Sequence, residues 1–220
     1  MTKVIPHFAG TDPLKTKKHY DYLLFKEAVM IMQRGEHLTI EGLQKIVNIR
    51  ASLNKGLTTV LKIAFPNSIP FSILPVPVNN TKLHPQWIAG FTSGDGCFKI
   101  SIRESKPYKA VRRSHVEILF ILTQHIRDEL LLKSFIDFFD CGHTYSYLNY
   151  IEFKCQSFKD NYEKILPLFQ KYPILGVKAL DFEDWTKVAE IIKSKEHLTN
   201  EGFEQIRQIK AKMNKGRYLK

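Results

Sequence analysis

The sequence predicts an α+β fold, in which a four-stranded antiparallel sheet carries helices on one face. Two observations point to this fold class. Helical and two-residue periodicities alternate between residues 85 and 172, and the segment that follows them repeats one near the N-terminus. The strands come in consecutive pairs with a helix before and after each pair, and this order favours an antiparallel sheet with its helices gathered on one face.

The elements between residues 85 and 172 follow the order helix, strand, strand, helix, strand, strand, helix. Pro85 suits the first position of the first helix, which extends to Asp95. Apolar and polar residues alternate after Gly96, as in a strand with one buried and one polar face. The remaining elements are expected at 115–125 (strand), 127–140 (helix), 142–147 and 150–158 (strands) and 159–172 (helix).

The chain contains an internal repeat at an offset of 160 residues. EHLTIEG at 36–42 matches EHLTNEG at 196–202, and 16 of the 44 positions from 13 to 56 are identical to their counterparts. Each copy has the pattern of two helices, the second capped by Thr39 or Thr199. We therefore interpret His37 and His197 as turn residues and not as catalytic ones.

The two copies of the repeat differ in what precedes them. About a hundred residues with strand and helix patterns precede the second copy, whereas almost nothing precedes the first. The expected organisation is a helical remnant of a first repeat at 1–64, whose front is absent, and a complete second repeat at 85–220. A proline-rich linker at 65–84 joins them.

Composition narrows the classes of protein to consider. The net charge of +11 favours a polyanionic partner, nucleic acid first. No apolar run reaches the roughly 18 residues of a membrane span, and the N-terminus lacks the apolar core of a signal peptide. The three cysteines show no CxxC spacing, so buried structural thiols are expected and not a zinc site.

The helix at 85–95 carries small residues and ends in an acid. Ala89, Gly90, Ser93 and Gly94 are spaced to share a face on which a second helix could approach closely. Asp95 opposes the helix dipole at the C-terminal end, a cost that a bound divalent metal would offset. The alternative is a simple Asp-Gly turn.

The open face of the predicted sheet and the loop beside it are rich in cations, aromatic rings and amides. Such a mixture suits phosphate contacts and groove readout, although a solvated sheet face would look similar. The candidate DNA-binding residues are Lys99, Ser101, Arg103, Lys106, Lys109, Arg112, Arg113, His143, Tyr145, Glu152, Lys154 and Gln156.

Several stretches together resemble the LAGLIDADG homing endonucleases of the single-chain, two-repeat type. IAGFTSGDG at 88–96 is similar to the nine-residue signature, with Asp95 at its catalytic acid. TQHIRD at 123–128, YPILGVKALDFEDW at 172–185 and EHLTNEGFEQI at 196–206 also resemble that branch. Such proteins are typically encoded in introns of fungal mitochondrial genomes, which implies a mitochondrial location.

The resemblance implies a fold, a reaction and roles for particular residues. Two signature helices would pack together, with a saddle-shaped sheet on each side lying along double-stranded DNA. Asp95 and the backbone of Gly94 would bind Mg²⁺ for hydrolysis of the phosphodiester bonds. Lys178 matches a lysine near the scissile phosphates, and Gln124 a position near the active centre.

The sequence departs from the family pattern in two ways. It holds one signature, so Lys18 repeats Lys178 but Asp95 has no counterpart. Leu119 and Ile121 stand where polar groove-reading groups are usual. Three interpretations follow: an endonuclease completed by a missing first half or a second copy, an RNA-binding maturase that assists intron splicing, or an inactive remnant.

Overall fold

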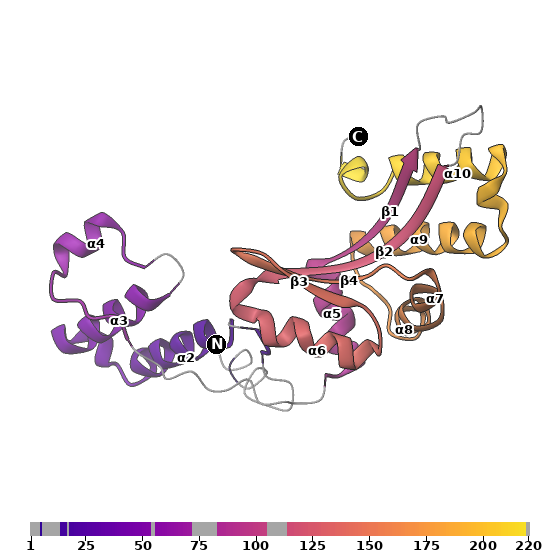
Figure 1. The fold of residues 1–220 in the computed structure, drawn as a ribbon. Coiled ribbons are helices and arrows are strands. Elements are labelled where there is room, and N and C mark those ends of the chain that lie inside the picture. Colours follow the sequence, from indigo (N-terminus) through magenta and orange to yellow (C-terminus); the bar gives the residue numbers. More distant parts are fainter. Residues whose placement is uncertain are drawn as a thin grey trace. The chain divides into compact units, whose positions relative to one another are not determined.

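The computed structural model describes Ile5 and residues 14–16, 18–53, 56–71, 83–104 and 114–218, except the side chains of Glu104, Ser114 and Tyr218 (Figure 1). The chain divides into two compact units, Met1–Thr81 and Lys82–Lys220. Four candidate DNA-binding residues lie outside the described residues: Lys106, Lys109, Arg112 and Arg113.

The first unit is helical in its described part. It contains α2 (Lys18–Gln33), α3 (Ile40–Ser52) and α4 (Thr59–Ala64). Leu24 and Ile31 of α2 pack against Ile49 of α3 to form its small core. The helix pair that the first copy of the repeat predicts is therefore present.

The second unit contains the sheet, and its strand order is β1-β2-β4-β3 with every pairing antiparallel. The strands are β1 (Gly96–Glu104), β2 (Ser114–His125), β3 (His143–Ser146) and β4 (Tyr150–Cys155). The helices are α5 (Pro85–Asp95), α6 (Glu129–Phe139), α7 (Phe158–Asp160), α8 (Leu166–Lys171), α9 (Val177–Lys193) and α10 (Asn200–Ala211). Figure 1 shows α5, α6 and α8 on one side of the sheet, which confirms the predicted fold class.

The core of the second unit lies between the sheet and these helices. Residues that alternate along β1 and β2 point into it, as the two-residue period predicts. Phe120 stands at its centre and contacts the rings of Phe98, Phe139, Phe153 and Phe169 at centroid distances of 5.4 to 6.3 Å. In Figure 1, none of the second unit's described helices lies over the opposite face of the sheet.

The predicted helix at 159–172 is interrupted. A wide turn of π type at Asn161–Ile165 separates α7 from α8. Pro167 explains the interruption, because proline has no N–H to donate and its ring collides with the carbonyl four residues earlier. The buried Asn161 fixes the wider turn, since its Nδ2 donates to the carbonyls of Ile118 and Cys155 at 3.0 and 3.2 Å.

The repeated EHLT segments form the same turn and cap in both copies. Thr199 Oγ1 accepts the N–H of Gly202 at 3.0 Å, and Thr39 does the same for Gly42. A Cβ at Gly202 would lie 2.2 Å from the carbonyl oxygen of Glu196, so a side chain cannot be accommodated there. Threonine and glycine recur for structural reasons, which agrees with the interpretation of the histidines as turn residues.

Phe120→Ala should lower the free energy of unfolding of the second unit by about 3 to 5 kcal/mol, because the ring is fully buried and a cavity would remain. Leu130→Ala on α6 is the matched control, since that side chain is 78% exposed, and its effect should be below about 0.5 kcal/mol. Urea unfolding followed by tryptophan fluorescence measures both. Equal losses in the two variants would contradict the placement of the core.

Candidate active site

Asp95 is the last residue of α5 and is exposed, immediately before β1 begins at Gly96. Its carboxylate accepts a hydrogen bond from Nε2 of Gln124, which comes from the end of β2. The register explains this contact: Gly96 pairs with Leu122, so Gln124 extends two residues past the start of β1 and reaches the end of α5.

Lys178 lies in the first turn of α9 and points its ammonium group at the junction between α5 and β1. Its Nζ donates to the carbonyl of Gly94 at 2.9 Å and to that of Gly96. Burial lowers the pKa of Lys178, and the nearby Cys97 thiol and Asp95 and Asp181 carboxylates act in the opposite direction. The structure thus brings Asp95, Gln124 and Lys178 together from three separate elements.

Cys97 lies beside this cluster at the start of β1. Burial raises the pKa of its thiol, so the protonated form is favoured. The other two cysteines, Cys141 and Cys155, have their sulfur atoms 3.8 Å apart and form no disulfide. Cys155 is buried, whereas Cys97 and Cys141 are half-buried. The expectation of buried structural thiols therefore fits Cys155 alone among the three.

The donor atoms near Asp95 determine what kind of metal could bind. Across the described part of the chain, no three His, Cys, Asp or Glu side chains gather into a metal site. The Asp95 carboxylate and the backbone carbonyl of Gly94 are hard oxygen donors. Mg²⁺ is often held by one or two carboxylates, with water and substrate phosphates as the other ligands. The cluster fits part of such a site, which further oxygen ligands would complete.

The small-residue face of α5 is narrower than the sequence predicts. Ala89 is buried in the core of its own unit, and Ser93 Oγ donates to the Ala89 carbonyl and accepts the N–H of Leu175. A Cβ added at Gly90 or Gly94 would meet nothing within 4 Å among the described residues. Only the two glycines therefore remain open to a neighbouring helix.

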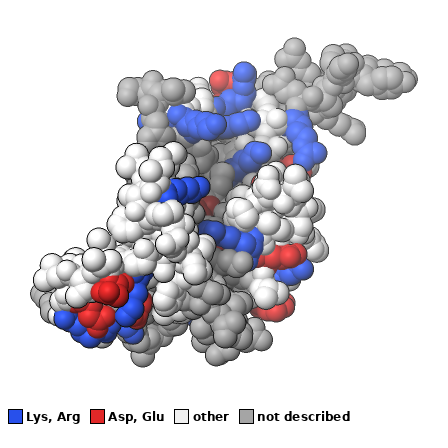
Figure 2. All heavy atoms as spheres, turned by 90° about the vertical axis from the view of Figure 1, so that its left-hand side faces the viewer, with Lys and Arg blue, Asp and Glu red and all other residues white. Residues whose placement is uncertain are grey.

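The open face of the sheet carries the described candidate DNA-binding residues at the positions that the alternation predicts. Lys99, Ser101 and Arg103 of β1 lie opposite Leu119, Glu117 and His115 of β2. His143 lies opposite Lys154, Tyr145 lies opposite Glu152, and Gln156 is exposed just past β4. Figure 2 shows Lys and Arg side chains gathered in the upper half of the view.

Internal ion pairs reduce the free positive charge of this face. Arg103 Nη2 lies 2.7 Å from Glu117 Oε2, and Lys154 Nζ lies 3.2 Å from Glu152 Oε2. Among the described residues, Lys99 makes no ion pair. The pairing of Arg103 with Glu117 was not predicted from the sequence, because the contact depends on the register between two strands.

Leu119 and Ile121 share the open face but are only 6% and 9% exposed. Their neighbours across the strands are Lys99 for Leu119 and Lys154 for Ile121. The two apolar side chains therefore form a buried floor between longer polar ones. They offer little surface to a ligand on this face.

An exposed aromatic cluster at the β3–β4 turn was not predicted. The rings of Tyr147 and Tyr150 stack with centroids 4.4 Å apart, and Leu148 between them is 90% exposed. The N–H of Ile126 donates to the carbonyl of Asn149 at 3.1 Å, which ties the turn to the end of β2. The sequence feature that could have indicated this cluster is the close spacing of three tyrosines, at positions 145, 147 and 150.

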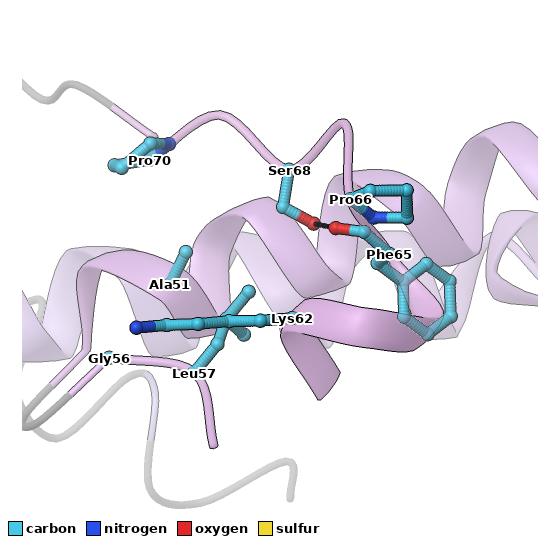
Figure 3. A pocket seen from close by; sticks show the side chains of 8 residues that line it. All are labelled: Ala51, Gly56, Leu57, Lys62, Phe65, Pro66, Ser68 and Pro70. Carbon is cyan, nitrogen blue, oxygen red and sulfur yellow. Dashed lines mark hydrogen bonds between the residues drawn. The ribbon is translucent and has the colours of Figure 1, made fainter. Parts of the chain in front are cut away.

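The first unit contains a cavity of about 410 Å³ that has none of the predicted site residues in its lining (Figure 3). Its lining residues are Ala51, Gly56, Leu57, Lys62, Phe65, Pro66, Ser68 and Pro70.

Among the helices of the described residues, none combines the length and the apolar character of a membrane span.

Comparison with known proteins shows the family of this chain. The profile of the LAGLIDADG endonuclease family matches residues 88–189. A crystal structure of the I-SmaMI LAGLIDADG homing endonuclease bound to cleaved DNA is 41% identical, with a TM-score of 0.88 over 97% of this chain and 71% of that chain. The chain belongs to the LAGLIDADG homing endonuclease family. The region of the family profile contains Asp95, Gln124 and Lys178.

Curated relatives of this LAGLIDADG chain come from fungi. Probable intron-encoded endonucleases 2 and 3 of Neurospora crassa are 37% and 34% identical, each over 94% of this chain. The chain spans 46% and 38% of their lengths, less than half in each case. A protein in intron 1 of ND4 from Podospora anserina is 31% identical over 53% of this chain and 26% of its own length.

Two glycines of the signature segment should respond to alanine in opposite ways. Gly90→Ala should raise the free energy of unfolding by about 1 kcal/mol, because alanine favours the helix and the added methyl group meets no atom. Gly96→Ala should lower it, since the new Cβ would lie 2.5 Å from Thr92 Cγ2 and 2.7 Å from the Thr92 carbonyl oxygen. Thermal unfolding of both variants tests this; stabilisation by Gly96→Ala would contradict the geometry.

Proposed function

We propose that this chain acts in a site-specific double-stranded DNA endonuclease, a homing endonuclease that hydrolyses phosphodiester bonds with Mg²⁺. One observation carries the proposal: Asp95, Gln124 and Lys178 converge at the end of an open polar sheet face. The I-SmaMI structures with cleaved DNA, and with uncleaved DNA in the presence of calcium, support a DNA substrate and a divalent ion.

Each residue of the cluster has a defined part in the proposed reaction. Asp95 and the Gly94 carbonyl would hold Mg²⁺, which when bound activates water and stabilises charge on the phosphate. Gln124 orients the Asp95 carboxylate by donating a hydrogen bond to it. Lys178 is fixed by two backbone carbonyls and supplies positive charge near the scissile phosphate.

We propose that the open face of the sheet binds the duplex. Lys99, Arg103 and Lys154 can contact phosphates, and amide, hydroxyl and imidazole groups on the same face can contact base edges. The stacked tyrosines lie on the same face by alternation with Tyr145, at the end of the sheet nearest Gln124. They extend the predicted DNA-binding surface toward the cluster.

A second acid is needed for cleavage of both strands, since the cluster supplies one carboxylate. We propose the division into a first-repeat segment at 1–64, a linker at 65–84 and a second repeat at 85–220. A first-repeat half carrying its own signature helix, or a second copy of this chain, would pack on the open Gly90 and Gly94. Lys18 would then take the part that Lys178 has in the second repeat.

An RNA-binding maturase is the second candidate function. The exposed stack of Tyr147 and Tyr150 favours it, because aromatic platforms suit unpaired bases. Such a protein needs the polar face but not a second acid. Preferential binding to intron RNA over duplex DNA would distinguish it from the endonuclease.

We propose a mitochondrial location for this chain. The intron-encoded endonucleases of Neurospora crassa and the ND4 intron protein of Podospora anserina support it by similarity.

Asp95→Asn should abolish metal-dependent cleavage while leaving duplex affinity within about threefold, because the change removes a metal ligand and not a phosphate contact. Asp137→Asn on α6, an exposed carboxylate on the helix side of the second unit, is the control and should leave both properties unchanged. The assay follows nicking and linearisation of a plasmid that carries the insertion site. Cleavage by Asp95→Asn at the normal rate would refute the metal assignment.

Glu117→Gln should raise the affinity for duplex DNA by about two- to tenfold, since Arg103 would lose its internal partner and could contact phosphate. Glu129→Gln on α6 makes the same charge change away from the open face and should have no such effect. Fluorescence anisotropy titrations over a range of salt concentrations measure both. If the two variants gained affinity equally, the sheet face would not be the binding surface.

A further inference from the structure

The segment after α10 returns to the candidate active site through Asn214. We infer that Asn214 is a positioning residue: its side-chain amide holds the start of β1 against α9 and thereby holds Lys178 beside Asp95. This inference rests on the proposed function, because that function assigns Lys178 and Asp95 their roles in cleavage. It adds a residue outside the family profile match at 88–189.

Asn214 makes three hydrogen bonds that link two elements. Its Nδ2 donates to the carbonyl of Phe98 at 3.1 Å, and its Oδ1 accepts from the Cys97 thiol at 3.8 Å. Its backbone N–H donates to Oδ1 of Asp181 on α9 at 3.0 Å. The amide of one side chain therefore spans two consecutive residues of β1, while its own backbone is held by α9.

These bonds close a ring of contacts that includes Lys178 of the cluster. Asp181 lies three residues after Lys178 on α9, so both side chains project from the same side of the helix. Lys178 in turn binds the carbonyls of Gly94 and Gly96, and Gly96 is two residues before Phe98. The start of β1 is thus tied to α9 at two points, which fixes the ammonium group relative to Asp95.

Most of the ring is partly shielded from water. Asp181 is 4% exposed, and the three hydrogen bonds of Asn214 are partly buried, so water competes for them less than at an open surface. A shift of about 1 Å in a catalytic group can cost a factor of about 100 in rate. A residue that restrains such a shift has a direct effect on turnover.

The backbone around Asn214 is specialised for this position. Asn214 has φ of 52°, in the left-handed region that asparagine tolerates better than most residues. A Cβ at Gly216 would lie 2.2 Å from the carbonyl oxygen of Ala211, so the turn requires glycine there. Asn214 and Gly216 are both repeated 160 positions earlier in the sequence, and so are Lys178 and Asp181 of α9. The four pairs are Lys18/Lys178, Asp21/Asp181, Asn54/Asn214 and Gly56/Gly216.

A different residue anchors the segment to α9. Arg217 binds Oδ1 of Asp181 at 3.0 Å and Oδ2 of Asp184 at 2.7 Å. The contacts of Arg217 hold the C-terminal turn in place but do not reach β1. The side chain of Asn214 can therefore be removed while the segment stays attached, which separates positioning from attachment.

Asn214→Gly is the test variant, because glycine accepts the left-handed conformation and keeps the backbone N–H to Asp181. It loses both side-chain bonds to β1. Asp184→Asn is the matched control, since it weakens the outer anchor and leaves the ring intact. With the protein in excess over the duplex and Mg²⁺ present, the single-turnover cleavage rate of Asn214→Gly should fall about tenfold or more at unchanged Kd. The control should match the unmodified chain in both quantities.

Amide hydrogen exchange of residues 96–98 in the free chain gives a readout independent of cleavage. Exchange there should accelerate about tenfold in Asn214→Gly and stay unchanged in Asp184→Asn. Unchanged exchange in Asn214→Gly overturns the inference, as does an equal acceleration in both variants. If the unmodified chain cuts no DNA in any assembly, the proposed function fails, and the exchange comparison still decides whether Asn214 holds β1.

Discussion

The hydrogen bonds from Lys178 to the carbonyls of Gly94 and Gly96 are the constraint on which the site depends. They join the end of α5 and the start of β1 to α9, so that the acid, the strand and the lysine share one rigid junction. The C-terminal end of a helix offers unpaired carbonyls, and an ammonium group satisfies them there. The same charge also faces Asp95 and offsets the unfavourable end of the dipole.

Much of the fold could be predicted from the sequence because its patterns are local. The alternation after Gly96 identified β1 and its buried face, and the capping threonines identified the starts of α3 and α10. The grouping of Asp95, Gln124 and Lys178 was expected from the resemblance to LAGLIDADG endonucleases and not from spacing, since 29 residues separate the first two. Their meeting depends on strand pairing.

The features that escaped prediction depend on contacts between distant segments. The pairing of Arg103 with Glu117 requires the register of β1 on β2, and the burial of Ala89 requires the position of the sheet under α5. In the sequence, Asn214 is one of several polar residues shared by the two repeats. Its hydrogen bond to β1 joins segments 116 residues apart and could not be predicted. The break in the helix at Asn161–Ile165 was visible in the sequence as Pro167, but the buried partners of Asn161 were not.

In the proposed function, the internal ion pairs on the open face affect how the chain searches DNA for its target. Arg103 and Lys154 already have carboxylate partners, so a random duplex must displace Glu117 or Glu152 to gain those two cations. Sequence-independent attraction to phosphates is correspondingly weaker, and the dwell time at unrelated sites is shorter. A matching target makes more base contacts, which compensate for the cost of displacing these carboxylates. The ion pairs therefore lower the affinity for all DNA but speed dissociation from the wrong sequence.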